Sequence, residues 1–219
     1  MFTDPKAIDF FTNNMILVKI EARVDTAISN RYYVRAFPTS ILMRKNGEEI
    51  DRLVGFDSTD AYLQMLVDYT NGIGTLDDLL GRAEGVVDRS LFMEIGDKYK
   101  YRGETEAATH WLNRVIEAGE PLDSLSGEAR SAMAYMLRKA EKYDEAIEAF
   151  GKIAREFVSM YHGMDAVIYK AICHRDKGDT VAAISTLEGY VEMFPESPDV
   201  EWAQEQIEKL KNPLEESAE

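Results

Sequence analysis

Residues 132–150 read AMAYMLRKAEKYDEAIEAF, and related stretches precede and follow this one in the second half of the chain. Each version places a small residue where two paired helices would pack. These small residues are Ala108, Ala146 and Ala183, which lie 38 and 37 residues apart. A repeat at such a period indicates stacked units that bury their apolar faces only against their neighbours. The second half of the chain is therefore expected to be an all-helical array.

This pattern resembles a tetratricopeptide (TPR) array over about residues 88–195, with a period slightly above the roughly 34 residues of that unit. Gly103 and Gly178 mark the turns inside the first and third repeats, and residues 142–144 take that place in the second. A polar helix is expected to close the stack. The expected limits are residues 75–211 for the TPR-like repeats with their capping helix and residues 212–219 for a solvated tail.

The TPR resemblance implies a binding surface for a protein or peptide partner on the concave side of the array, lined by the first helix of each pair. A strip of cations with two tyrosines is expected there, and tyrosines often carry contact energy at interfaces. The alternative is that these are ordinary solvated charges on packed helices. Met93 and Asp97 stand where chaperone-binding TPR domains need a cation and an amide, so a heat-shock-chaperone adaptor is not expected. The predicted partner-binding residues are Lys100, Tyr101, Tyr135, Arg138, Lys139 and Arg175.

The first 74 residues have a different pattern, in which β-branched runs alternate with turn signals. Asp4-Pro5 is typical of a helix start, an N-cap followed by proline at the first helical position. Asn46-Gly47 between two apolar runs predicts an antiparallel hairpin with a tight primed turn. Asp57 is expected to cap the last helix. The expected elements are a helix through Phe11 that ends at Asn13-Asn14, a strand at Met15–Glu21, a helix at Asp25–Tyr33, strands at Ser40–Lys45 and Glu48–Val54, and a helix at Ser58–Tyr69.

The order of these elements resembles the C-terminal two thirds of a thioredoxin-like domain. In that family the proline matching Pro38 is cis, and the backbone beside it pairs with an extended substrate segment. The alternative is a trans proline that starts a strand. The resemblance therefore implies a substrate-binding role for Phe37, Pro38 and Thr39. The residues that carry the resemblance are Val18-Lys19-Ile20, Tyr33 through Thr39, Asn46-Gly47 and Arg52 through Gly55.

The redox cysteines of the thioredoxin-like family have no counterpart in this sequence, whose single cysteine is Cys173. Thiol–disulfide exchange needs an attacking thiolate and a second sulfur, so no catalytic residue is predicted. The strand that would lead into C-x-x-C is also missing, which would leave open sheet edges that invite pairing with another chain. The expected fold class is thus an α+β lobe, a partial thioredoxin-like fold over residues 1–74, followed by an all-α TPR superhelix.

Charge and composition narrow the classes of partner. The 40 acidic and 25 basic residues give a formal net charge of −15, which disfavours nucleic acid and anionic membrane surfaces. His110, His162 and His174 show no metal-ligand spacing, so neither a metal nor a cofactor is predicted. His174 is expected to be buried and hydrogen-bonded, and Cys173 to be an inert buried thiol.

Two functions of different classes are consistent with these patterns. The first is a protein–protein interaction module in which the array binds a polypeptide and this chain catalyses nothing. The second is a thiol–disulfide oxidoreductase or redox chaperone whose C-x-x-C lies upstream of Met1, which leaves the enzyme assignment open. A homodimer formed through the open sheet edges is a third expectation. The protein is expected in the cytoplasm if Met1 is the true start, and in the periplasm or outside the cell if a leader precedes it.

Overall fold

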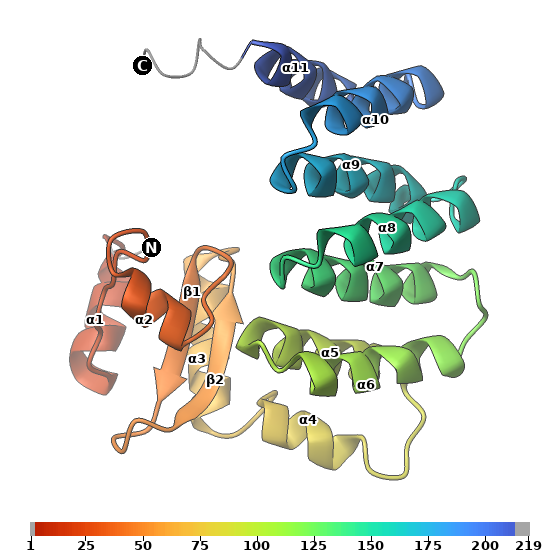
Figure 1. The fold of residues 1–219 in the computed structure, drawn as a ribbon. Helices are drawn as coiled ribbons and strands as arrows, with labels where there is room; N and C mark the ends of the chain where they lie inside the picture. The colour runs from red at the N-terminus through yellow and green to blue at the C-terminus, as the bar shows by residue number, and fades with distance from the viewer. Residues whose placement is uncertain (1–2, 213–219) are drawn as a thin grey trace. The chain divides into compact units, whose positions relative to one another are not determined.

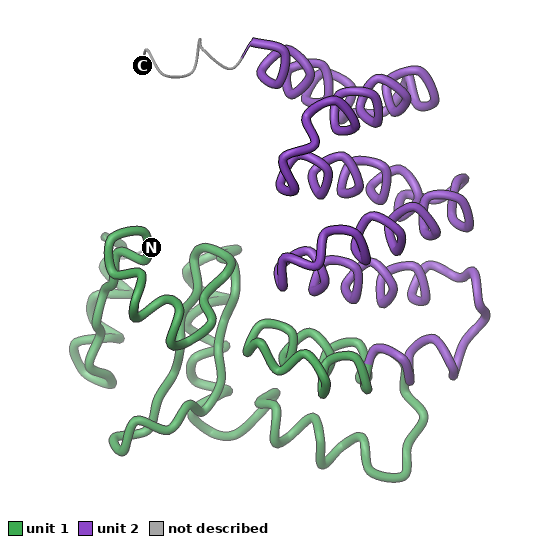
Figure 2. The backbone as a smooth tube through the Cα atoms, in the orientation of Figure 1, with its two compact units in different colours: residues 1–111 green, residues 112–219 purple. Residues whose placement is uncertain are grey.

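The computed structural model describes residues 3–212, and its ribbon is drawn in Figure 1. This part of the chain is mostly helical and contains one two-stranded antiparallel sheet. The chain forms two compact units, residues 1–111 and 112–219 (Figure 2). Of the predicted solvated tail, only Asn212 lies within the described residues.

Unit 1 combines a small α+β lobe with the helices that follow it. Its elements are α1 (Pro5–Asn14), α2 (Thr26–Arg31), β1 (Thr39–Met43), β2 (Glu49–Val54), α3 (Thr59–Thr70), α4 (Leu76–Arg82), α5 (Arg89–Arg102) and the first part of α6 (Thr105–Glu117). The start of α1 is as predicted, because the Asp4 side chain accepts the N–H of Lys6 at 2.9 Å. The predicted cap of α3 is wrong by one residue. Ser58 has the extended backbone of an N-cap, and its hydroxyl accepts the N–H of Ala61 at 3.2 Å.

The core of the lobe forms where α1 and α3 pack against each other and α3 packs on β2. Each element contributes the apolar positions that its own period places on one face, which is what an amphipathic element needs in order to fold against a neighbour. The tyrosines of α3 are included, and the hydroxyl of Tyr62 bonds to Ser40 on β1 at 2.6 Å. The buried residues of this core are Ala7, Phe11, Leu53, Tyr62, Leu66 and Tyr69.

The predicted antiparallel hairpin is confirmed, with a register from Thr39 opposite Val54 to Met43 opposite Glu49. The predicted tight primed turn is wrong. A primed turn centred on Asn46-Gly47 needs positive φ at Asn46, and of these two residues only Gly47 has it, at +84°. The Gly47 N–H donates to the Arg44 carbonyl at 2.9 Å, and the Arg44 N–H donates to the Glu48 carbonyl at 2.8 Å, so three residues form the loop.

The predicted strand at Met15–Glu21 is wrong, because this segment is extended but belongs to neither strand of the described sheet. A strand needs a neighbour that pairs with its N–H and C=O groups. No other segment of residues 3–212 is placed to supply them, since the sheet contains β1 and β2 only. The helix after this segment, α2, agrees with the prediction, and the Phe37–Pro38 peptide bond is cis, as predicted.

Unit 2 is a series of helices in which each packs against the next. Beyond the end of α6, its helices are α7 (Ser124–Lys139), α8 (Tyr143–Glu156), α9 (Tyr161–Asp176), α10 (Thr180–Met193) and α11 (Val200–Lys211). The three repeated alanines are all fully buried, as expected of small residues between paired helices. The structure shows helical pairs followed by α11, and the assignment of these helices as TPR-like repeats with a capping helix stays a prediction.

The turn inside each helical pair uses a left-handed residue at the same place in the repeat. Gly103 has φ +79°, Glu141 has φ +60° and Gly178 has φ +90°. In each turn two N–H groups bond back to carbonyls of the preceding helix, as Glu141 does to Arg138 at 3.0 Å. The predicted division after residue 74 lies inside unit 1, where α4 packs on α5, and it stays a prediction.

Candidate functional site

A buried carboxylate on β2 joins the lobe of unit 1 to the helices that follow it. Asp51 is 0% exposed, and its Oδ2 accepts the N–H of Leu76 at 2.7 Å and the ammonium of Lys98 at 2.9 Å. Its Oδ1 accepts a bond from Arg102 at 3.2 Å. A buried charge is tolerated only when its lone pairs are filled in this way. The carboxylate therefore connects β2 with the start of α4 and with α5.

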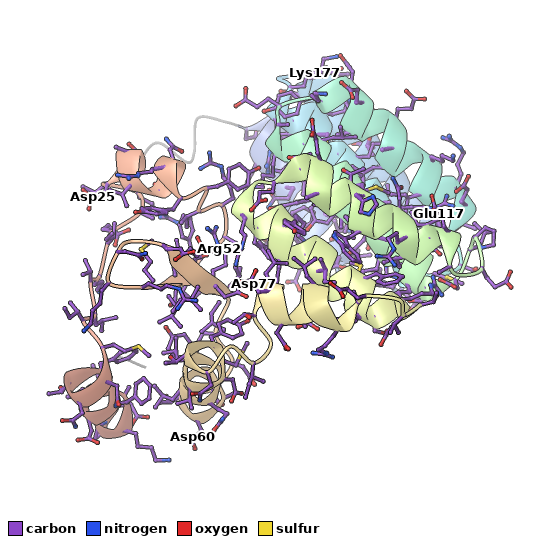
Figure 3. All side chains as sticks on the ribbon, turned by 90° about the horizontal axis from the view of Figure 1, so that it is seen from below. Asp25, Arg52, Asp60, Asp77, Glu117 and Lys177 are labelled. Atoms are coloured by element: carbon purple, nitrogen blue, oxygen red, sulfur yellow. The ribbon has the colours of Figure 1, made fainter. Side chains whose placement is uncertain are left out.

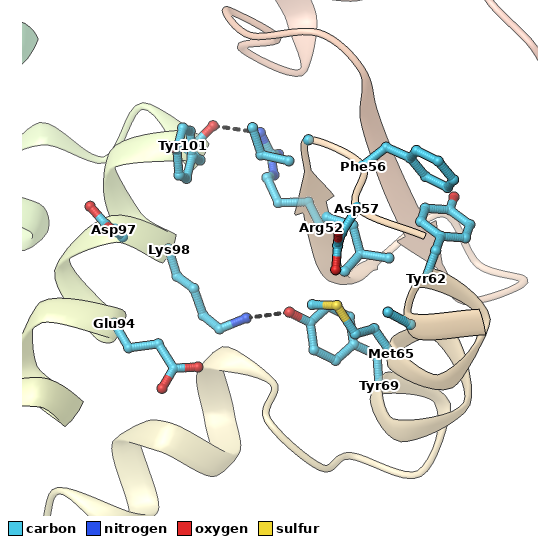
Figure 4. Close-up of a pocket in the computed structure, with 14 residues that line it drawn as sticks. Arg52, Phe56, Asp57, Tyr62, Met65, Tyr69, Glu94, Asp97, Lys98 and Tyr101 are labelled. Carbon is cyan, nitrogen blue, oxygen red and sulfur yellow. Dashed lines mark hydrogen bonds between the residues drawn. The ribbon is translucent and has the colours of Figure 1, made fainter. Parts of the chain in front are cut away.

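The next residue of β2 continues this connection from the opposite side of the strand. The Arg52 guanidinium forms two bonds to the Glu49 carboxylate, at 2.7 and 2.6 Å. Its remaining nitrogen donates to the backbone carbonyl of Tyr32 at 2.9 Å. It also donates to the backbone carbonyl of Tyr101 at 2.7 Å (Figure 4). The planar fork of arginine suits this combination of bidentate and single bonds. Arg52 thus ties the end of α2 and the end of α5 to the hairpin.

The loop before β1 contacts α5 at a glycine. Gly103, which ends α5, lies against the ring of Tyr33, and an added Cβ would be 2.6 Å from the ring's Cγ. Tyr33 has a left-handed backbone of its own, with φ +52°, and the Arg35 guanidinium lies 4.8 Å from its ring centroid. The absence of a side chain at Gly103 is what allows this close approach.

A pocket of about 460 Å³ lies between the end of β2, α3 and α5, all within unit 1 (Figure 4). Four aromatic rings and one methionine give it an apolar wall, which is typical of binding pockets. Its cations have partners already: Arg52 is bound to Glu49, and Lys98 to Asp51 and the Tyr69 hydroxyl. The lining residues are Arg52, Leu53, Val54, Gly55, Phe56, Asp57, Ala61, Tyr62, Met65, Tyr69, Glu94, Asp97, Lys98 and Tyr101.

The carboxylates that line the pocket are less completely paired than its cations. Asp97 bonds to the ammonium of Lys100 on the same helix. The side-chain carboxylates of Asp57 and Glu94 make no hydrogen bond or ion pair within residues 3–212. Figure 4 shows Glu94 beside Lys98 on α5, and Asp57 at the end of β2. Aromatic rings next to unpaired carboxylates form a surface that attracts a cation with an apolar stem.

The predicted substrate-binding step of the lobe lies at the entrance to β1. Phe37 is exposed, and Pro38 accepts the N–H of Gly55 on its carbonyl at 2.8 Å. The Thr39 hydroxyl donates to the Ala36 carbonyl at 2.8 Å. These residues are outside the lining of the pocket, and their role in binding stays a prediction.

Two of the predicted partner-binding residues belong to unit 1, and both are at the pocket or next to it. Tyr101 lines the pocket, whereas Lys100 does not. The Lys100 ammonium is held by Asp97 and lies 4.6 Å from the centroid of the Tyr101 ring. Tyr101 thus contributes to the pocket and Lys100 pairs with Asp97, and the predicted role of both residues on the concave face of the array stays a prediction.

The other predicted partner-binding residues belong to unit 2. Arg138 and Arg175 both bind Asp176, at 2.6 and 2.9 Å, and their hydrogen bonds outweigh burial to hold the pKa of this carboxyl below its usual value. The Lys139 ammonium lies 5.1 Å from the centroid of the Tyr135 ring. Two of these three cations are thus occupied within the array, and the predicted role of this group in partner binding stays a prediction.

The histidines and the cysteine provide no assembled chemical site in the described residues. No group of three His, Cys, Asp or Glu side chains in residues 3–212 could hold a metal ion. His174 is half-buried, and burial lowers its pKa. The hydrogen bond expected for it is not formed at Nδ1, whose nearest carboxylate in the described chain, Asp179, is 4.0 Å away. None of the described helices combines the length and apolarity needed to cross a bilayer.

The thiol of Cys173 should be unreactive in the folded protein. It is fully buried, and burial raises its pKa to about 11, so at neutral pH roughly one thiol in ten thousand is ionised. We expect Ellman's reagent to modify the native chain at least ~100-fold more slowly than the urea-unfolded chain. Equal rates in the two states would contradict the burial of this side chain.

The residues that build the pocket and the buried network were largely missed by sequence reasoning. Asp51 and Lys98 are 47 positions apart and lie in segments that were assigned to different domains. The sequence offered one signal for the buried network, which is the acidic residue Asp51 between apolar positions of the predicted strand Glu48–Val54. It is a weak one, because exposed strand faces carry such residues routinely.

Comparisons with known proteins give only distant similarity. No protein-family model matches the chain, and no curated protein matches it. The chain is similar to a crystal structure of kinesin light chain TPR-like repeats from Podospora anserina, at 12% identity and a TM-score of 0.49, covering 69% of this chain and 78% of that one. It is also similar to MamA, at 15% identity and a TM-score of 0.44, covering 75% of this chain and 99% of that one. Neither similarity assigns the chain to a family, and its TPR-like character stays a prediction from the repeated alanines.

Proposed function

We propose that this chain is a protein–protein interaction scaffold that binds a polypeptide and catalyses no redox reaction. The observation that carries the proposal is the pocket of unit 1, where aromatic side chains adjoin the unpaired carboxylates of Asp57 and Glu94. Helical repeats of this kind commonly present extended binding surfaces. The pocket suits a basic side chain of the partner, since its stem can pack on Met65 and the aromatic rings while its charge meets the carboxylates.

The thioredoxin-like character of the lobe is part of the same proposal. It is supported by the Phe37-Pro38-Thr39 step, the antiparallel hairpin and α3, which follow one another in the order of that family. The absence of redox activity is supported by Cys173, the single thiol of the chain, whose burial keeps it in the unreactive form. The lobe would then contribute to partner binding by placing β2 and α3, which form one wall of the pocket, against α5.

The binding proposal can be tested with two labelled peptides that differ in one charge. One is fluorescein-Gly-Ser-Leu-Arg-Leu-Ser-Gly, and the other carries citrulline, which is neutral and nearly the same shape, in place of arginine. Fluorescence anisotropy should give tighter binding of the arginine peptide by about tenfold, a difference of about 1.4 kcal/mol. Equal affinity for the two peptides, or no binding of either, would overturn the proposal.

Charge-neutral variants locate the binding. The double variant Asp57→Asn, Glu94→Gln should lose most of the preference for arginine, because amides keep the shape of the pocket wall and remove its charge. The matched control is Glu201→Gln on α11, an exposed carboxylate of unit 2, which should leave the preference unchanged. A preference that survives in the double variant and falls in the control would place the site elsewhere.

A further inference from the structure

The segment between α1 and α2 exposes an apolar run that is unusual for the surface of a folded chain. Residues 15–21 read MILVKIE, and the side chains of Ile16 and Val18 are 95% and 71% exposed. Leu17 and Ile20 are also exposed. β-Branched residues favour strands, and a cluster of them in water commonly marks an interaction site. Figure 3 shows this stretch as extended backbone without helix or strand.

This segment is held in its extended form from both ends. The N–H of Met15 donates to the Phe11 carbonyl at 3.1 Å, and Met15 packs on the core of the lobe. At the other end, the Glu21 carbonyl accepts the N–H groups of Val24 at 2.9 Å and Asp25 at 2.8 Å. Between these anchors no backbone hydrogen bond is formed within the described residues. The backbone groups of residues 16–20 therefore have no partner among the described residues and are available to another strand.

The edge of β1 that faces away from β2 also has backbone N–H and C=O groups without a partner in the described sheet. The Pro38 carbonyl and the Arg44 N–H both bond toward β2, to Gly55 and Glu48, so every second residue between them faces β2 as well. The N–H and C=O groups of Thr39, Ile41 and Met43 therefore face the other way. The described sheet ends at β1, which leaves these groups unpaired on that side. Such an edge is a template for another strand.

We propose that two copies of this chain pair reciprocally, residues 16–20 of each adding as a strand to the β1 edge of the other. Each copy carries both halves of the interaction, so a two-fold dimer satisfies both edges and closes without forming a fibre. The local charges permit it: Thr39–Met43 carries none, and residues 16–20 carry only Lys19. Recognition would come from backbone hydrogen bonds and from the apolar side chains. The pocket is not part of this interface.

The net charge gives the proposed dimer a property that distinguishes it from a complex with a basic partner. Two chains of formal charge −15 repel each other at low ionic strength, so added salt should strengthen the dimer. A complex held by charge attraction would weaken in the same experiment. The salt dependence therefore separates a second copy from a basic partner as the occupant of this edge.

Sedimentation of the full chain over the micromolar range, at low and at physiological salt, tests the proposal. We expect a monomer–dimer equilibrium that shifts toward dimer as salt is added. Val18→Asp should weaken the dimer at least tenfold, because it charges the added strand. Ile41→Pro should do the same, because it removes an outward N–H and leaves the bonds to β2 in place. Val181→Asp, at an exposed valine of α10, is the matched control and should have no effect.

Each of the other outcomes overturns the proposal. A wild-type chain that stays monomeric at all concentrations and salts has no such interface, and this includes a monomer that binds an extended peptide at β1. A dimer that is lost in Ile41→Pro but kept in Val18→Asp pairs through β1 alone. Thermal melts of the variants exclude misfolding, since Val18 is exposed and its substitution should leave the melting curve unchanged.

Discussion

Replacing Asp51 by alanine should lower the free energy of unfolding of unit 1 by about 3–5 kcal/mol, because it leaves the Lys98 ammonium buried without its carboxylate. The backbone N–H of Leu76 and the Arg102 guanidinium lose the same acceptor. The expected loss is large compared with the total stability of an ordinary domain. Urea unfolding gives the change, and hydrogen exchange of peptides from β2 and α5 shows where the protection is lost.

A second substitution tests whether the cost comes from the uncompensated charge. Lys98→Met keeps the apolar stem and removes the ammonium, so adding it to Asp51→Ala should recover part of the stability that the first change removes. Full recovery is not expected, because Leu76 and Arg102 still lack their partner. If the two substitutions were additive, the ion pair would not be the source of the loss.

Gly163→Ala should be among the most damaging single-methyl changes in unit 2. Gly163 lies in the first turn of α9, where an added Cβ would overlap the carbonyl oxygen of Phe157 and come within 2.5 Å of its carbonyl carbon. Backbone atoms cannot rotate away as a flexible side chain can. Overpacking usually costs about 1–3 kcal/mol, and the backbone contact places this change at or above the upper end of that range.

Gly189→Ala is the control for this prediction. Gly189 is inside α10, and an added Cβ there would meet no atom within 4 Å. Alanine is the better helix former, so this variant should gain about 0.5–1 kcal/mol. Urea unfolding of the two variants side by side gives both values. Similar effects of the two substitutions would contradict the close contact between Gly163 and the turn before it.

The helical array could be predicted from the sequence because its signal is local and repeated. Ala108, Ala146 and Ala183 recur with the helix pairs, and each is fully buried in the structure. The left-handed turn at Glu141 follows the same register as Gly103 and Gly178, although its side chain gave no sign of it. The predicted turn of the second repeat, at residues 142–144, is one to three positions too late, because Glu141 lacks the glycine that marks this turn in the other two copies.

The candidate site could be predicted only in part, because its contacts are distant in sequence. Tyr101 was found as an aromatic position of the first helical pair, but the opposite wall comes from Phe56, Tyr62 and Met65 of the lobe. The predicted cation strip failed to anticipate that Asp97 would hold Lys100 and that Asp176 would hold two arginines. Charge pairing of this kind depends on side-chain geometry that periodicity does not contain.

In the lobe, one strong local sequence pattern predicted a strand that the structure does not form. Residues 15–21 have the composition of a strand, and the structure leaves residues 16–21 exposed and outside the sheet. Strand propensity expresses how well residues fit a pleated, half-buried surface, and it supplies no pairing partner. The pattern could not indicate whether a neighbouring strand exists.

The most direct test of binding at the pocket is a methyl NMR titration of the chain labelled at methionine. Met65 lines the pocket, whereas Met193 is an exposed methionine of α10 in unit 2. Adding the arginine peptide should shift the Met65 methyl resonance and leave that of Met193 in place, and the citrulline peptide should shift Met65 less at equal concentration. A Met65 resonance that does not move with the arginine peptide, or that moves equally with both peptides, would contradict binding of a basic side chain at this site.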